Sequence, residues 1–184
     1  MKSKSTGSSA GSSMQFVEQH VIKHKHPAFN ELDQLAFTAK NLYNEALYAN
    51  RKIFFDNQYG KTDTWLPLQS YVDQARQFKE SENYRKLPAK VAQWVLKLVD
   101  KAWKSYFSAL KAFKKTPSLF NAKPKPPYYL DKIKGRFLTV YTIQALSQVG
   151  LRKGLLQPSG TKLSFKSRIA RKAIKYSHKY RIQQ

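Results

Sequence analysis

LPAKVAQWVLKLVDKAWKSYFSALKAFKKTP, residues 87–117, has the period of a long amphipathic helix. At about 100° per residue, one side of this helix is apolar and carries Val91, Val95, Leu98, Val99, Ala102, Tyr106, Leu110 and Phe113. The opposite side carries the lysine row, which is Lys90, Lys97, Lys101, Lys104, Lys111 and Lys115. Asp100 is the only carboxylate in the stretch, so the usual neutralisation between residues i and i+4 is expected to be missing.

A row of charges of one sign has two interpretations. It is either a solvated face, as most charged helix faces are, or a surface for a polyanion that neutralises its self-repulsion. The whole chain favours the second, because 34 Lys and Arg against 11 Asp and Glu give a formal charge of +23 and a pI near 10.2. Such values are typical of nucleic-acid-binding proteins.

Composition also limits the other function classes. A membrane surface is the competing polyanion, but the chain has no apolar run of transmembrane length and no lipidation motif, so no membrane partner is expected. The absence of cysteine excludes a disulfide, a thiol nucleophile and cysteine-ligated zinc, and is compatible with a reducing compartment. Hydrophobic residues make up 41% of the chain, enough for a folded core.

The distribution of acidic residues predicts that the chain is not an enzyme. Nine of the eleven acids precede Asn83, and only Asp100 and Asp131 follow it. Two-metal phosphodiester hydrolysis needs several converging carboxylates, which the second half cannot supply. No serine-histidine motif and no phosphate-binding glycine loop is present either. The histidines at positions 20, 24 and 26 are expected to be basic decoration, so no catalytic residue, metal or cofactor is predicted.

The N-terminal segments precede the helices. Residues 1–13, MKSKSTGSSAGSS, are rich in Ser and Gly and are expected to be a leader or linker, with Met14 as the native start. Residues 14–26 contain a short run with β-branched residues, Gln15–His24, which predicts a first strand.

Residues 27–116 predict a small bundle of three helices. Pro27 opens the first, which carries apolar residues at three- and four-residue spacing and ends at Gly60. The second is expected over Thr64–Glu82, with Pro67 in its first turn, and the third is the lysine-faced helix.

The remaining third of the chain changes character. Residues 117–135, here called the strap, contain four prolines with lysines and tyrosines between them, which predicts an extended basic segment. Residues 136–184 predict strands at Arg136–Tyr141, at Thr161–Ser167 and at the C-terminal end, with a helical turn over Gln144–Leu151. The last of these strands begins without a following turn, so we expect the β domain to be truncated at its C-terminus.

Three blocks in this order, LAFTAKNLYNEALYANRKIFF, LPAKVAQWVLKLVDKAWKSYFSALKAFKKTPSLFNAKPKPPYY and KGRFLTVYTIQALSQVGLRKGLLQPSG, resemble the N-terminal part of the TnpB (OrfB-type) transposon proteins. The resemblance implies an α+β fold, in which a helical recognition domain is inserted into a small wedge-type antiparallel β-barrel that need not be complete here. It also implies RNA-guided cleavage of double-stranded DNA beside a transposon-adjacent motif. The family's RuvC-like nuclease and its zinc ribbon follow this part and are missing from the chain.

The resemblance further implies the partners and the location. They are guide RNA and double-stranded DNA, together with a missing C-terminal nuclease part, in a prokaryotic cytoplasm where the protein is nucleoid-associated. The guide–target heteroduplex would be bound through its shape and charge.

Site residues follow partly from the resemblance and partly from side-chain chemistry. Alignment on AWKSYF places Lys90 and Gln93 of the helix, and Tyr141 and Thr142 of the following strand, at the positions that contact the DNA motif. A glutamine amide can bind an adenine edge through two hydrogen bonds. Tyr128 and Tyr129 are predicted to stack on unpaired bases. Contacts to the nucleic-acid backbone are predicted for Arg51, Lys97, Lys101, Lys104, Lys111, Lys115, Lys123, Lys125, Lys134 and Arg136.

Two other functions remain open at this point. The chain could be a free-standing helix-turn-helix-like DNA-binding regulator, or a structural RNA-binding protein of the ribosomal kind. A reading frame that continues into an Asp-bearing nuclease would favour the TnpB-like function, and tight binding to ribosomal RNA would favour the last.

Overall fold

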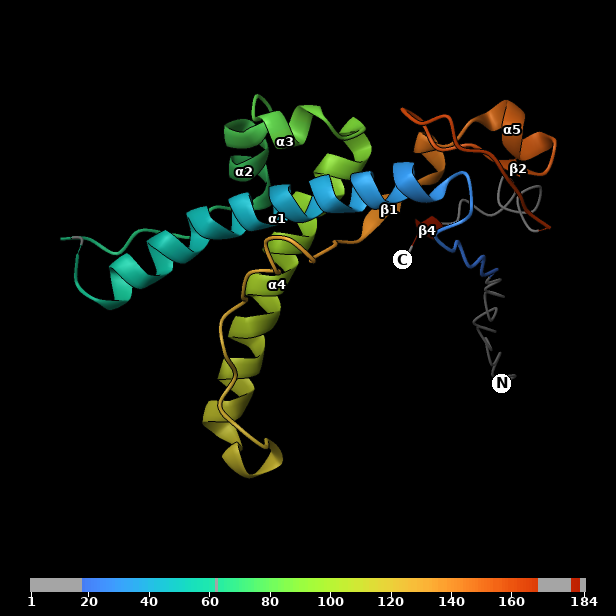
Figure 1. Ribbon diagram of the computed structural model, residues 1–184. Coiled ribbons are helices and arrows are strands. Elements are labelled where there is room, and N and C mark those ends of the chain that lie inside the picture. The colour runs from blue at the N-terminus through green and yellow to red at the C-terminus, as the bar shows by residue number, and fades with distance from the viewer. Residues whose placement is uncertain (1–17, 62, 169–179, 183–184) are drawn as a thin grey trace, which may run out of the picture.

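The computed structural model describes residues 18–61, 63–168 and 180–182, and its fold is α+β (Figure 1). Its helical elements are α1 (Phe29–Gln58), α2 (Tyr71–Phe78), α3 (Glu82–Arg85), α4 (Ala89–Lys115), the 3₁₀ turns η1 (Pro117–Leu119) and η2 (Ile143–Ala145), and α5 (Gln148–Arg152). Its strands are β1 (Thr139–Tyr141), β2 (Leu155–Leu156), β3 (Phe165–Lys166) and β4 (Tyr180–Ile182). No helix among these residues is both long and apolar enough to cross a lipid bilayer.

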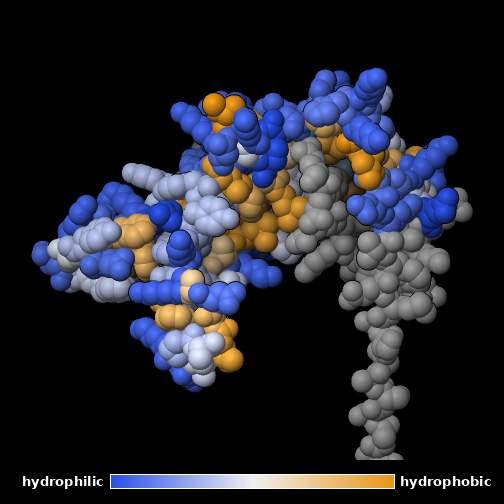
Figure 2. All heavy atoms as spheres, turned by 60° about the horizontal axis from the view of Figure 1, so that its bottom comes forward, coloured by the Kyte–Doolittle hydropathy of each residue, from blue (hydrophilic) through white to orange (hydrophobic). Residues whose placement is uncertain are grey.

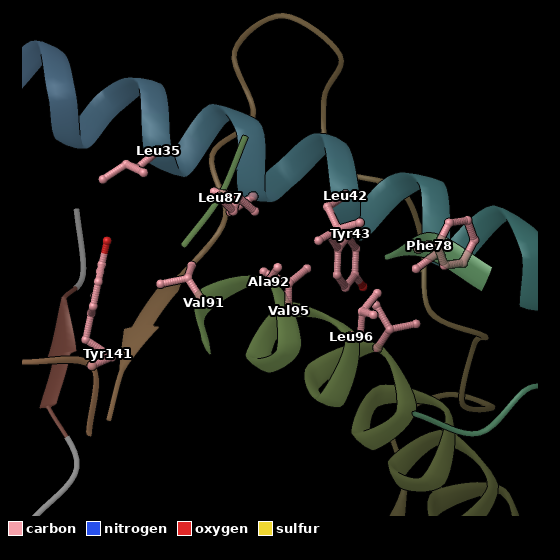
Figure 3. Packing of buried hydrophobic residues seen from close by; sticks show 14 of the residues in the cluster. Leu35, Leu42, Tyr43, Phe78, Leu87, Val91, Ala92, Val95, Leu96 and Tyr141 are labelled. Carbon is pink, nitrogen blue, oxygen red and sulfur yellow. The ribbon is translucent and has the colours of Figure 1, made fainter. Parts of the chain in front are cut away.

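Two long helices cross and form the centre of the molecule (Figure 1). Figure 3 shows Leu42 and Tyr43 of α1 pointing at Val95 and Leu96 of α4. Alanines at positions 39, 46 and 92, all fully buried, allow close approach of the two backbones at this crossing. The predicted first and third helices are therefore confirmed. Gly60, with φ of 63°, follows the end of α1 as expected.

The buried stripe of α4 is displaced from the predicted one. Ala92, Leu96 and Trp103 are buried with Val91, Val95 and Val99. Leu110 and Phe113 are only half-buried, because α4 extends beyond the crossing and its distal half projects away from α1 (Figure 1). We call this distal half, Lys104–Lys115, the arm. Of its half-buried residues, Tyr106 near the start still contacts Phe54 of α1 with ring centroids 5.9 Å apart, whereas Phe113 packs on Phe120 of the strap at 5.6 Å.

The predicted helix over Thr64–Glu82 is confirmed only in part, because α2 covers Tyr71–Phe78 alone and a second short helix, α3, begins at Glu82. Ser70 forms a capping box with Asp73 and so fixes the start of α2. Ser81 caps α3 three residues after α2 ends. Pro67 lies in a segment without regular secondary structure before α2. With α3 the helical unit contains four helices instead of three.

The β part consists of two separate two-stranded antiparallel sheets among the described residues. β1 pairs with β4, with Val140 opposite Arg181, and β2 pairs with β3, with Leu156 opposite Phe165. The strand predicted near the C-terminus is confirmed by β4. The strands predicted over Arg136–Tyr141 and Thr161–Ser167 are shorter than expected, and the sheets do not close into a barrel.

The first predicted strand, Gln15–His24, is wrong where the structure describes it. Residues 18–23 have no regular secondary structure, and Val21 is 72% exposed. Glu18 explains this conformation, since its carboxylate accepts hydrogen bonds from Ser167 Oγ at 2.6 Å and from Arg168 N. The segment is tied to the chain after β3 by a side chain and not by a strand ladder. Residues 15–17 and the predicted leader 1–13 lie outside the described residues.

Candidate nucleic-acid interface

The lysine row lies on the exposed side of α4. All six lysines are exposed, because the opposite side of the helix faces α1 and the strap. Lys104 Nζ lies 2.7 Å from Asp100 Oδ2, so the expectation of an unneutralised row is wrong for this residue. No described carboxylate lies within salt-bridge distance of Lys90, Lys101, Lys111 or Lys115. Four like charges of the row therefore remain available to a polyanion. Lys97 also has no such carboxylate, but its Nζ lies 5.0 Å from the Tyr71 ring and 5.4 Å from the Trp94 ring.

The N-terminal end of α4 carries the residues predicted to contact the DNA motif. Lys90 is exposed and Gln93 is half-buried in the first turns of the helix. The first turn contains no acidic residue, and no side chain caps it. The loop after β2 lies against this end, because a Cβ on Gly160 would be 3.0 Å from Pro88 Cγ. This loop, Pro158–Lys162, lines a pocket of about 480 Å³ together with Gln144 and Ser147.

Tyr141 is not on this surface, which corrects the prediction that it contacts the DNA motif, whereas the predicted contact of Thr142, which is half-buried, remains a prediction. The Tyr141 side chain is fully buried, and Figure 3 shows its hydroxyl pointing toward α1. Burial, and secondarily the charge of Glu31, raises the pKa of Tyr141 to about 12. The Thr142 hydroxyl is also buried. The physical reason is that β1 packs against both long helices, so the strand contributes to the core.

The strap returns from the tip of the arm along α4 to α1 (Figure 1). Lys123, Lys125 and Lys134 are exposed on it, as predicted for backbone contacts, and Tyr128 is 76% exposed. These positions are accessible to a polyanion, and their binding roles remain predictions. Figure 2 shows apolar surface at the tip of the arm among hydrophilic side chains, where Leu119 is 79% exposed.

Arg51 and Arg136 are used inside the molecule, which corrects their assignment as contacts to a nucleic-acid backbone. Arg51 Nη1 donates a hydrogen bond to the carbonyl of Pro127, and its guanidinium lies 5.0 Å from the Phe55 ring and 5.1 Å from the Tyr129 ring. Arg136 forms two parallel bonds of 2.7 Å to the Asp33 carboxylate. This pair holds the pKa of Asp33 below its usual value, chiefly through the hydrogen bonds. The Tyr129 ring is therefore covered in part by the Arg51 guanidinium, and 43% of the residue is exposed to solvent.

Two further residues of α1 hold the strap and were missed by the sequence analysis. Lys40, only 1% exposed, donates to the carbonyl of Lys132 at 2.7 Å, and burial lowers its pKa. Asn44 donates to the carbonyl of Leu130 at 2.9 Å and accepts from its amide at 3.0 Å. With Asp33 and Arg51 these residues form what we call the α1 ladder. Their spacing of seven, four and seven residues places them on one face of the helix.

A second side of α1 holds the segment before α2 in the same way. Asn50 donates to the carbonyl of Gln69 at 3.0 Å and accepts from its amide at 2.8 Å. Asn57 makes the same pair of bonds with Leu66, at 2.7 and 3.0 Å. The signal available in the sequence was the presence of five asparagines in α1, three of which (Asn44, Asn50 and Asn57) make these bonds, since asparagine is a poor helix former that binds backbone groups well.

The described residues contain no cluster of three or more His, Asp or Glu side chains placed to hold a metal ion. The histidines near the N-terminus have local partners. His20 Nε2 lies 3.3 Å from Glu18, and His26 Nδ1 accepts a hydrogen bond from the Ala28 amide. Asp131 also has a local role, because it accepts bonds from the amides of Ile133 and Lys134, which lower its pKa.

Comparison of the chain with protein-family models finds no match, and comparison with curated proteins finds none. The likeness to the TnpB proteins therefore rests on the three sequence blocks. The function must be argued from the charges and the exposed side chains.

Proposed function

We propose that the chain is a nucleic-acid-binding module of a TnpB-like RNA-guided DNA endonuclease, without catalytic residues of its own. Its partners would be guide RNA, the guide–target heteroduplex and the double-stranded DNA beside the transposon. We further propose a prokaryotic cytoplasmic location for it. The observation that carries the binding function is the lysine row, of which Lys90, Lys101, Lys111 and Lys115 are exposed without a described carboxylate partner.

The charge distribution supports nucleic acid as the polyanion. Lys123 and Lys125 follow the arm directly along the chain, and the strap that carries them packs against it. Tyr128, which is exposed on the same strap, provides a ring on which a base can stack. Lysines beside an exposed aromatic ring suit a nucleic acid, which offers both phosphates and π faces.

Two parts of the interface have separate proposed roles. Lys90 and Gln93 at the start of α4 would contact the transposon-adjacent motif, since the amide of Gln93 can distinguish an adenine edge. The distal lysines would contact phosphates and contribute affinity without sequence preference. Tyr141 has no part in this proposal, because its side chain is fully buried.

Titration of binding against salt tests the proposal. We expect simultaneous Lys101→Gln, Lys111→Gln and Lys115→Gln to lower the slope of log K against log salt by up to about 2.7, at about 0.9 per lost phosphate contact on double-stranded DNA. At 0.1 M salt this corresponds to a loss of affinity of up to about 500-fold. The measurement is fluorescence anisotropy with a labelled DNA duplex over a salt series.

A matched control removes the same charge elsewhere. Lys61, Lys79 and Lys86 are exposed outside the arm and the strap, and their replacement by Gln also lowers the net charge by three. If this control lowers the slope as much as the arm variant, the chain binds through its net charge alone and the proposed interface is wrong. Sequencing of the RNA that co-purifies with the chain then addresses the guide, because transposon-end RNA supports the proposal and a preference for ribosomal RNA contradicts it.

A further inference from the structure

The strap between the tip of the arm and α1 can form few backbone hydrogen bonds that would stabilise its conformation. Prolines at positions 124, 126 and 127 have no amide hydrogen, so this stretch cannot form a strand ladder. The stretch is fixed at one end by the contact of Phe120 with Phe113. At its other end it is fixed by Arg51, which binds the carbonyl of Pro127, and by Asn44, which binds both backbone groups of Leu130.

Asn44 makes two hydrogen bonds to the backbone of one residue, Leu130. A side-chain amide that both donates to and accepts from one residue fixes the position and the rotation of that peptide backbone, as a neighbouring strand would. Asn44 is uncharged and only half-buried, and its distances of 2.9 and 3.0 Å are those of good hydrogen bonds. It therefore sets the register at which the exposed residues of the strap face solvent.

We propose that Asn44 is a positioning residue for nucleic-acid binding, through which Lys123, Lys125 and Tyr128 are presented together to one polyanion. This inference rests on the proposed function. Without Asn44 only the bond from Arg51 to the Pro127 carbonyl would hold this end of the strap. Lys123 and Lys125 would then no longer be kept where both reach phosphates of one polyanion, because ordering them there would cost more entropy than the contacts return. Lys132 and Lys134 depend less on Asn44, because Lys40 holds the first and the Asp131 turn holds the second.

The test uses a substitution that leaves the net charge unchanged and measures the salt dependence of binding, which depends on the number of phosphate contacts. We expect Asn44→Ala in the full chain to lower the salt slope on a DNA duplex by up to about 1.8, as two strap lysines lose their phosphates. The affinity at 0.1 M salt would fall by up to about 60-fold. A loss of folded protein would lower the active fraction and leave the slope unchanged, so the slope separates positioning from stability.

Asn50→Ala is the matched control. It removes the same pair of amide–backbone bonds from the same helix, but on the segment before α2. Asn50 is more deeply buried than Asn44, so Asn50→Ala should disturb folding at least as much. If Asn44→Ala does not fold, the equally neutral Asn44→Ser takes its place, because its shorter side chain with a single oxygen cannot make both bonds to the Leu130 backbone.

The double variant Lys123→Gln and Lys125→Gln completes the experiment. The inference is supported if three results are obtained together. Asn44→Ala lowers the slope to the value of this lysine variant, and the combination of the two has the same slope as either alone. Asn50→Ala leaves the slope unchanged. If the lysine variant lowers the slope and Asn44→Ala does not, the inference is overturned while the proposed function stands. If Asn50→Ala lowers the slope equally, the inference is also overturned. If no lysine variant of the strap or the arm changes the slope, the proposed function falls and the inference with it.

Discussion

Tyr141→Phe distinguishes a core residue from a residue that contacts DNA. The substitution removes one hydroxyl and keeps the ring, which is fully buried between the helices and β1. Among the described residues the hydroxyl has no hydrogen-bond partner. A buried hydroxyl without a partner costs about 1–3 kcal/mol, so we expect the variant to be as stable as the parent or more stable by about 1 kcal/mol at neutral pH.

The pH dependence gives a second magnitude for the same substitution. Burial raises the pKa of Tyr141 from 10.0 to about 12, so the folded state favours the protonated phenol. The corresponding stabilisation is fully present below pH 10 and is lost as pH rises from 10 to about 12. Two pKa units correspond to about 2.7 kcal/mol, and the phenylalanine variant has no such loss. The stability difference in favour of the variant should therefore grow by roughly 2–3 kcal/mol across this range.

Urea denaturation at neutral pH and at steps between pH 10 and 12 measures this difference, with tryptophan fluorescence as the signal. Other tyrosines with raised pKa values, such as Tyr43, occur in both proteins and cancel in the comparison. A difference that stays constant across this range would refute the burial argument. Loss of DNA sequence preference with unchanged stability would restore the original prediction that Tyr141 contacts the motif.

Three further predictions concern α1, the start of α4 and the loop that lies against it. Asn50→Ala should lower the free energy of unfolding by about 2–3 kcal/mol in a urea titration, because it leaves the two partly buried backbone groups of Gln69 without partners. Asn57→Ala should cost about 1 kcal/mol or less in the same titration, because its bonds to Leu66 are exposed to solvent. Gly160→Ala should cost more than Gly60→Ala by thermal unfolding, because both have positive φ but only the first would place a Cβ against Pro88. Gln93→Ala should relax the preference for one base position in a binding selection and leave the salt slope unchanged, and a uniform loss over all sequences would contradict base recognition.

The elements that the sequence predicted well are those with a long hydrophobic period. α1 and α4 each carry an apolar stripe over many turns, so their bounds followed from periodicity and from Pro88 and Gly60 at their ends. The exposure of the lysine row followed from the same projection. The helix predicted at Thr64–Glu82 begins only at Tyr71, because Asn50 and Asn57 of α1 bind the backbone of its predicted first part, and such long-range bonds leave no local pattern.

The β segments at Arg136–Tyr141 and Thr161–Ser167 are shorter than predicted for a related reason. A strand three residues long, such as β1, is defined by its partner and not by its own alternation. Tyr141 alternates like a strand residue, but nothing in the sequence states which side faces the helices. Its burial could only be established once the crossing of α1 and α4 was known.

The arginines and the lysines that were assigned to the interface have different roles, which the net charge alone does not reveal. Arg51 and Arg136 both bind oxygen atoms of this chain and lie against aromatic rings, at 5.0 Å from Phe55 and 4.9 Å from Phe37. A planar guanidinium can donate several bonds in fixed directions and stack on a ring, which suits it to holding a segment in place. The ammonium of lysine is compact and strongly hydrated, and the lysines assigned to the interface are all exposed. In this chain of charge +23, Arg51 and Arg136 are therefore better interpreted as anchors, and the phosphate contacts should be sought among the lysines.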